Sequence, residues 1–364
     1  MKSLTPIKLM DSSRSILSSS AIDRAIRRAL AFLRRVQLPH GEFKTLLAPD
    51  ASLANGVFDG SPFVTSFVLH TLTHFERASI ADMADKALQF LEEEMELGGV
   101  WRYYSVRQWK HRRIPPDLDD TATASYVLRL FDRSVLSNRW IFRNCRDSYG
   151  RYRTWMLPSR AYVSRLRLIL SLTEINARWR LPAMPPEYSK DPRFSSAIDI
   201  VPADDVDPVV NANVILYLGE SRETKAAISY LVGLVQNGIA GGFSLYYTDP
   251  LALFYMIARA SLHSAPSLTA CEGALVRETI ARQKAEGSFG TPLSTALGAG
   301  VLLTFVPSEE VTELAIRSLL RMQRGDGSWE RHALYSGPLE HWGSDELSTA
   351  LALEAIERYR KVIC

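Results

Sequence analysis

Apolar and polar positions along this chain follow the period of a helix, and two kinds of helix can be distinguished. The first kind, as in residues 29–37 and 315–323, has arginines between its apolar positions, as expected for a helix with one solvated face. The second kind is apolar almost throughout. It follows Ser, Thr, Asp or Pro residues that suit a first helical turn, at about residues 61, 119, 207, 249, 291 and 345.

A short pattern recurs after the charged helices: a glutamine, three residues, a glycine, one residue and an aromatic ring. Clear copies begin at Gln37, Gln283 and Gln323, and degraded copies end at Trp101 and Phe243. Repetition with this period predicts six helix pairs, each with an outer charged helix and an inner apolar one. We expect an all-α fold, an (α/α)6 barrel (toroid), in which the inner helix starts meet at one mouth. An open α-solenoid has a similar period and is the alternative.

The spacing of the inner helices also predicts the domain organisation. Successive starts are about 42 to 58 residues apart, except for about 88 residues between positions 119 and 207. We therefore expect a flexible segment over residues 1–20 and one domain over 21–364. An insert at about 131–201 would contain the third outer helix (161–175) and cover the mouth.

Composition narrows the range of functions. A content of 46% hydrophobic and 23% charged residues is ordinary for a globular domain, and a net charge of +3 gives no reason to expect nucleic-acid binding. The three widely spaced cysteines suggest a reducing, cytoplasmic setting. No stretch reaches the roughly 20 apolar residues of a membrane-spanning helix, which leaves peripheral membrane contact open.

Three carboxylates crowd the start of the second inner helix, at Asp117, Asp119 and Asp120. One acid would suffice as a helix cap, and capping is the alternative interpretation of all three. Carboxylates this close cannot all ionise readily, and an apolar mouth would raise the pKa of one of them further. A carboxylic acid kept protonated in this way can protonate a base as weak as an alkene or an epoxide.

Residues 117–122, Asp-Leu-Asp-Asp-Thr-Ala, resemble the D-x-D-D-T-A motif of class II terpene cyclases, which include squalene–hopene cyclases and copalyl-diphosphate-type diterpene cyclases. The glutamine–glycine–aromatic pattern resembles the QW repeats of the same superfamily, from about residue 29 to the end. The resemblance implies Asp119 as proton donor, supported by Asp117 and Asp120, with no required cofactor. Family members normally pair two helical domains and this chain has room for one, so a homodimer or a separate partner domain is a further expectation.

Basic and aromatic side chains are predicted to surround the substrate. The loop before Asp117 carries four cations that suit a diphosphate, although solvated surface charge is the alternative: Arg107, Lys110, Arg112 and Arg113. Aromatic faces stabilise carbocations without trapping them, and the candidates are Tyr246, Tyr247 and Trp342. A second acidic cluster either holds Mg²⁺ on a diphosphate or caps the third inner helix: Asp204, Asp205 and Asp207.

These patterns together predict a protonation-initiated cyclase that acts on a linear isoprenoid, in particular a prenyl diphosphate whose diphosphate is retained. The alternative is a non-catalytic α/α-toroid that binds a prenyl lipid or a protein partner. The environment of Asp119 distinguishes them. A catalytic acid faces a deep apolar cavity, whereas a structural acid binds backbone N–H groups beside a shallow groove.

Overall fold

The computed structural model describes residues 19–157, 168, 202, 204–239, 241–337 and 340–363. Helices predominate in this part of the chain, which confirms a mostly helical fold. The third outer helix predicted at 161–175 lies outside the described residues, as does most of the segment predicted to be flexible at the N-terminus. No helix in the described ranges has the length and apolar character needed to cross a bilayer.

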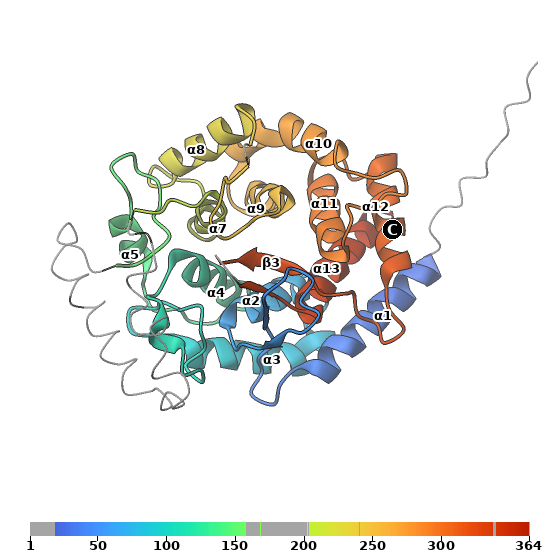
Figure 1. Cartoon of the computed structure of the whole chain (residues 1–364), viewed down its shortest axis with the longest axis horizontal. Coiled ribbons are helices and arrows are strands. Elements are labelled where there is room, and N and C mark those ends of the chain that lie inside the picture. Colours follow the sequence, from blue (N-terminus) through green and yellow to red (C-terminus); the bar gives the residue numbers. More distant parts are fainter. Residues whose placement is uncertain are drawn as a thin grey trace, which may run out of the picture.

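Six largely buried helices lie around a common centre (Figure 1). Each contacts the next in chain order, and the last returns to the first, so the contacts run in a closed cycle. The six are α2 (Pro62–Leu72), α4 (Leu118–Leu130), α7 (Pro208–Leu218), α9 (Pro250–His263), α11 (Pro292–Phe305) and α13 (Asp345–Ile363).

These inner helices begin where the sequence predicted. The side chains of Ser61, Asp207 and Asp249 accept hydrogen bonds from first-turn N–H groups, and a proline follows each of them. The proline has no N–H that would be left unpaired, and its fixed φ suits the first turn. Local capping chemistry therefore fixes the end of each helix that faces the mouth.

Five amphipathic helices of the described residues lie outside this ring (Figure 1). In α1, for example, Ile22, Ala29 and Leu33 are fully buried, while Arg34 and Arg35 face solvent. The five are α1 (Ser19–Val36), α3 (Arg77–Glu94), α8 (Lys225–Gln236), α10 (Glu272–Ile280) and α12 (Glu310–Met322). A 3-10 turn, η4 (Pro266–Cys271), precedes α10.

The repeated glutamines join one outer helix to the next. The side-chain amide of Gln323, just after α12, donates to the carbonyl oxygens of Gly327 (3.0 Å) and Ala25 in α1 (2.9 Å). Gln37 and Gln283 make the same two kinds of bond, to their own glycine and to the following outer helix. The bond from Gln323 to Ala25 links the last outer helix to the first.

The glycine of this pattern is required by the same contact. Gly327 has φ +96°, and a Cβ on it would lie 2.3 Å from the carbonyl oxygen of Arg28 in α1. No side chain fits there, and L residues rarely adopt this φ. Gly41 and Gly287 approach the next outer helix equally closely.

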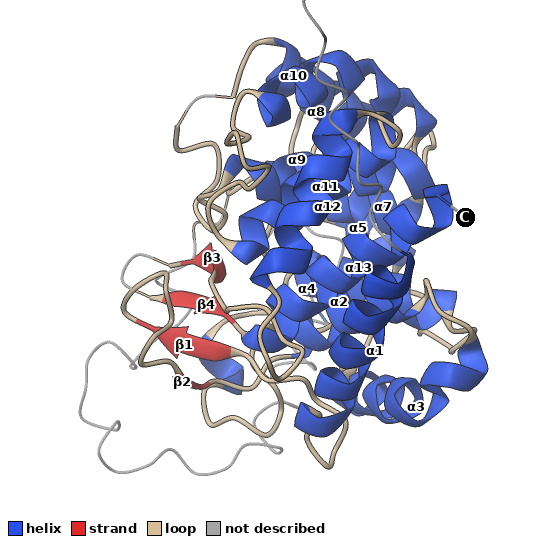
Figure 2. Cartoon of the chain, turned by 90° about the vertical axis from the view of Figure 1, so that its right-hand side faces the viewer, coloured by secondary structure: helices blue, strands red, loops and turns tan. Residues whose placement is uncertain are grey.

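A small antiparallel sheet, which the sequence analysis did not predict, lies outside the helices at one end of the ring (Figure 2). Its strands, in the order β2-β1-β4-β3, are β2 (Val57–Phe58), β1 (Leu46–Ala48), β4 (His341–Gly343) and β3 (Ala333–Ser336). Leu46 pairs with Gly343, and Ala48 with His341. The sheet thus joins the loop before α2 to the loop before α13 and covers part of the mouth.

The described part of the predicted insert is built into the body of the protein. It contains α5 (Arg139–Asn144), and the side chains of Ile141, Phe142, Tyr152 and Met156 are fully buried. Part of the segment 131–157 is therefore packed into the core. The prediction of a cover over the mouth now rests on residues 158–201, of which only residue 168 is described.

Candidate active site

The acidic motif opens α4 at the mouth of the ring. Asp117 has an extended backbone conformation, and its Oδ1 accepts a hydrogen bond from the N–H of Asp120 at 2.8 Å. The N–H of Leu118 donates to the carbonyl oxygen of Thr154 at 2.9 Å. This bond holds the start of α4 against the described part of the insert. Asp117 is thus the helix cap, and the other two acids are left for a different role.

Asp119 binds side chains from two other inner elements. Its Oδ1 accepts from Nδ2 of Asn213 in α7 at 2.7 Å, and its Oδ2 accepts from the hydroxyl of Tyr247, before α9, at 2.5 Å. Arg259 of α9 donates to Oδ1 of Asn213 at 2.6 Å. Because a guanidinium can only donate, the amide of Asn213 must turn its NH₂ group towards Asp119.

Opposing effects act on the pKa of Asp119. Burial is the largest influence and raises the pKa of Asp119, whereas the hydrogen bonds from Tyr247 and Asn213 and the charge of Arg259 act in the opposite direction. The side chain of Tyr247 stays neutral, since burial raises its pKa well above the usual value. Asp119 remains 8% exposed. It is a buried acid whose anion already has two neutral donors.

Burial favours the protonated form of both Asp117 and Asp120. If both were ionised, Oδ2 of Asp117 and Oδ1 of Asp120 would be buried without a donor. Burial raises the pKa of Asp117 to about 7 and that of Asp120 well above its usual value, and the negative charge of Asp117 is the second cause for Asp120. A proton on Asp120 that is donated to Asp117 removes the penalty of two adjacent buried charges.

Aromatic rings of the small sheet reach the tyrosine that binds Asp119. The ring of Tyr335 in β3 lies 6.2 Å from that of Tyr247 and is stacked on Trp342 of β4 at 6.0 Å. The hydroxyls of Tyr335 and Tyr103 are 3.2 Å apart. The predicted residues Tyr247 and Trp342 therefore share one cluster near Asp119. Tyr246 lies beside it and accepts a hydrogen bond from Nε1 of Trp155 at 2.8 Å.

An enclosed cavity lies deeper among the inner helices. The space open to the centre of a water-sized sphere is about 10 Å³, which is room for about one water molecule. Its walls come from α2, α4 and α9: Ser66, Phe67, Thr123, Tyr126, Val127 and Arg259. This cavity is far smaller than the roughly 300 Å³ or more of a typical ligand pocket. Asp119 is not among its lining residues, so it is not the deep apolar cavity that was predicted beside a catalytic acid.

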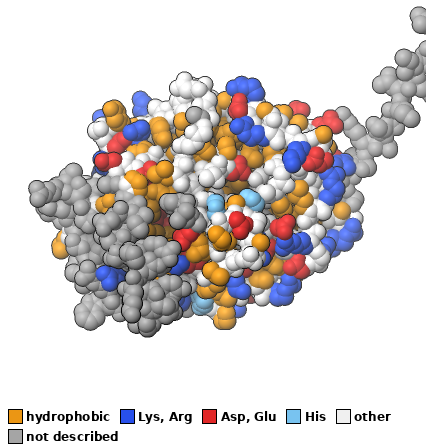
Figure 3. All heavy atoms as spheres, viewed as in Figure 1, with side chains coloured by type: hydrophobic (Ala, Val, Ile, Leu, Met, Phe, Trp, Pro, Cys, Tyr) orange, Lys and Arg blue, Asp and Glu red, His pale blue; other side chains and the backbone are white. Residues whose placement is uncertain are grey.

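Two of the four predicted diphosphate ligands are paired with carboxylates of the protein. Arg107 binds Glu93 and Glu94, each at 2.6 Å, and Lys110 binds Asp59 at 3.0 Å. The other two, Arg112 and Arg113, are half-buried in the 3-10 turn η1 (His111–Arg113). A diphosphate would therefore have to compete with internal acids for Arg107 and Lys110, and the role of all four cations stays a prediction. Basic and acidic side chains are interspersed over the visible part of the mouth face (Figure 3).

The members of the second acidic cluster have separate partners. Asp207 caps α7 by accepting from the N–H of Val209 at 2.7 Å, and burial raises its pKa to about 7. Asp205 accepts from the hydroxyl of Thr154 at 2.5 Å, and Asp204 forms an exposed ion pair with Arg153. The capping alternative is correct for Asp207, and Mg²⁺ binding stays a prediction.

Sequence reasoning did not select three residues of this site: Asn213, Arg259 and Tyr335. Arg259 had a usable signal, because it is the single charged residue in the apolar stretch 250–262 and a buried charge needs a partner. Tyr335 reaches the site through the unpredicted sheet.

No protein-family model and no curated protein matches this sequence. Solved structures do match. One is a protein from Actinoplanes, with a TM-score of 0.65 and 18% identity over 93% of this chain and 99% of that one. Another is the type II terpene cyclase MstE from Scytonema in complex with geranylgeranyl dihydroxybenzoate, with a TM-score of 0.66 and 15% identity over 94% and 98%. The ent-copalyl diphosphate synthase from Streptomyces platensis gives 0.55 and 15% over 82% of this chain and 50% of that one. This chain shares the fold of class II terpene cyclases.

Proposed function

We propose that this protein is a class II terpene cyclase in which Asp119 protonates a linear isoprenoid. The observation that carries the proposal is the environment of the Asp119 carboxyl group. It is buried at the mouth, its pKa is raised, and it is bound by the side chains of Asn213 and Tyr247 rather than by backbone N–H groups. A helix cap has no need of such partners.

We propose that the acidic proton lies on Oδ2 of Asp119. Oδ1 faces the NH₂ group of Asn213, which Arg259 holds in place and which can only donate, whereas Oδ2 faces the hydroxyl of Tyr247, which can rotate. The π electrons of a substrate double bond take this proton to form a C–H bond, which leaves a carbocation and the carboxylate. The carboxylate then accepts from Tyr247 and Asn213 without reorganisation, and Arg259 strengthens the second bond.

The carbocation needs π faces and room. Tyr247, Tyr335 and Trp342 supply aromatic faces next to the acid. A prenyl chain requires several hundred Å³, far more than one water molecule occupies. We therefore propose that the aromatic side chains of β3 and β4 shift outward when substrate binds, so that their rings line the substrate instead of filling its space.

The proposed substrate is a linear prenyl chain with an anionic head that is retained. Arg107, Lys110, Arg112 and Arg113 would bind a diphosphate, with Mg²⁺ at Asp204, Asp205 and Asp207 as an optional addition and no other cofactor. Of the structural neighbours, MstE is in complex with its substrate geranylgeranyl dihydroxybenzoate, and another is a copalyl diphosphate synthase. Dihydroxybenzoate is accordingly a second head group to test.

We also propose that the ring is a complete (α/α)6 barrel, with the third outer helix at 161–175. Supporting this, the described inner helices already contact one another in a closed cycle. A second helical domain is not needed on this view, since the MstE chain is matched over 98% of its length. A cytoplasmic location and a homodimer remain proposals.

Incubation in D₂O tests the function directly. Farnesyl diphosphate, geranylgeranyl diphosphate and geranylgeranyl dihydroxybenzoate are each supplied with and without Mg²⁺, and products are analysed by mass spectrometry before and after phosphatase treatment. A protonation-initiated cyclase gives an isomer that contains one solvent deuterium and keeps its head group. Release of inorganic diphosphate would show ionisation instead. Binding of all three compounds without turnover would favour the alternative, a non-catalytic toroid that binds a prenyl lipid.

A further inference from the structure

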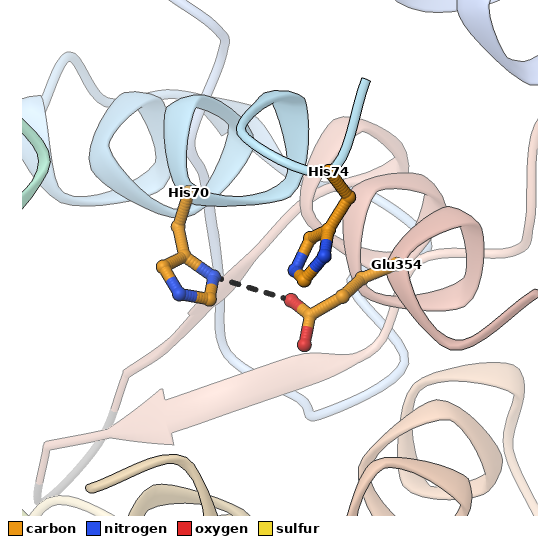
Figure 4. A group of neighbouring side chains, drawn as sticks. All are labelled: His70, His74 and Glu354. Atoms are coloured by element: carbon orange, nitrogen blue, oxygen red, sulfur yellow. Dashed lines mark hydrogen bonds and ion pairs between the residues drawn. The ribbon is translucent and has the colours of Figure 1, made fainter. Parts of the chain in front are cut away.

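A second group of polar side chains consists of His70, His74 and Glu354, which lie next to one another (Figure 4). His70 is in the last turns of α2, His74 follows the end of that helix, and Glu354 is in the middle of α13. His70 is nine residues beyond the cap Ser61, which places it about 13 Å from the mouth end of α2 at 1.5 Å per residue. The group therefore joins the first inner helix to the last.

The three side chains turn their polar atoms towards one another. One ligand atom from each lies within 4.8 Å of the other two, and Nδ1 of His70 is 3.3 Å from Oε2 of Glu354. Zinc bonds of about 2.0–2.1 Å with tetrahedral angles place neighbouring ligand atoms about 3.4 Å apart. One pair already has this spacing, and small side-chain rotations would close the others.

One nitrogen of this group has no partner in the described structure. Nε2 of His74 is buried and has no hydrogen-bond partner among the described residues. Buried polar atoms without partners are uncommon in folded proteins, and each calls for a cause.

Neighbouring groups hold the carboxylate in place. The hydroxyl of Tyr255 donates to Oε2 of Glu354 at 2.8 Å, an outer contact of the kind that orients metal-binding carboxylates. Arg358 is 3.5 Å from the other oxygen, and its second NH₂ group is bound to Thr304 at 2.9 Å. Arg358, Arg259 and Lys361 are close enough for their positive charges to act on His70 or His74. They weaken the attraction for a cation, so binding would depend on bonds to the three ligands and not on the net charge of the site.

We propose that His70, His74 and Glu354 bind one divalent transition-metal ion, with zinc as the best fit to two imidazoles and a carboxylate. A water molecule would fill the fourth position. The ion would clamp α2 to α13 and so fasten the ring where its two ends meet. This inference is independent of the proposed cyclase activity.

Zinc binding is tested on the full chain without a polyhistidine tag, after dialysis against a chelator. We expect one Zn²⁺ per chain by elemental analysis. We also expect a melting temperature about 3 °C higher at a hundredfold excess of Zn²⁺ over its Kd. Co²⁺ substitution should give the visible absorption of a four-coordinate site.

Two variants decide whether these residues are the ligands. His74→Gln should lose the bound zinc and the melting shift while melting like the metal-free wild type. His263→Gln is the matched control, because His263 lies against His70, with ring centroids 5.8 Å apart, but is not in the group. It should keep both. Equal zinc binding by wild type and His74→Gln, or no stoichiometric binding by wild type, would overturn the proposal.

Discussion

Replacement of Asp119 by asparagine separates the chemistry of this acid from its place in the structure. The asparagine side chain has the same shape, can still accept from Asn213, and can donate to the hydroxyl of Tyr247 in place of accepting from it. It has no acidic proton. We expect turnover of the accepted isoprenoid to fall by about a thousandfold or more, near the upper end of general-acid effects. That loss corresponds to about 4 kcal/mol of transition-state stabilisation.

The stability of Asp119→Asn should not fall together with its turnover. The pKa of Asp119 is raised above its unfolded value, so the folded protein binds this proton more tightly and stability is lost as pH rises above the unfolded pKa. Asparagine has no such charge to bury. Thermal melts at pH 8 should therefore place Asp119→Asn at or above wild type, and the difference should shrink at pH 5. Asp132→Asn is the matched control, because the side chain of Asp132 is 95% exposed; it should keep both activity and melting temperature. Early melting of Asp119→Asn, or wild-type turnover, would show that Asp119 is only structural.

Three further predictions concern the scaffold. Gln323→Ala should lower the free energy of unfolding by about 1 to 3 kcal/mol in denaturant titrations, because two carbonyl oxygens lose a donor. Activity per folded molecule should survive. The control Gln89→Ala removes only an exposed hydrogen bond and should change the free energy of unfolding by less than about 0.5 kcal/mol. Gly327→Ala should cost about 3 kcal/mol from backbone strain and the clash with α1, whereas Gly325→Ala, with open space around it, should melt like wild type; equal melts would contradict the close contact. Burial raises the pKa of Glu42 to about 8, so wild-type stability should fall between pH 6.5 and 8 by up to about 1.4 kcal/mol per pH unit relative to Glu42→Gln, and parallel stability curves would refute this.

The helices could be predicted because their signals are local. Ser61 and Asp249 stand directly before Pro62 and Pro250, and capping chemistry involves only the next few residues. The sheet had no such signal. Its strands have two to four residues, too few to show alternation, and Leu46 pairs with Gly343 from the other end of the chain. Pairing over that separation depends on the ring that brings the two loops together.

The residues of the candidate site also divide into those that the sequence predicts and those that only the fold brings together. Asp117, Asp119 and Asp120 could be found because they are adjacent in sequence and resemble a known motif. Asn213 and Arg259, which fix the orientation of the acid's partners, come from two other helices and meet Asp119 only in the folded protein. No pattern along the chain specifies that Arg259 contacts Asn213 and not another buried acceptor.

The hydrogen bond from Gln323 to Ala25 and the contact between α13 and α2 have a consequence for how this architecture can change. An open repeat array can lose or gain a unit, because each unit contacts only its neighbours and a new end can be capped. Here each of the six described inner helices has a neighbour on both sides, so loss of one would leave two apolar faces uncovered. The number of inner helices is therefore constrained, and we expect variation in the loops that join them.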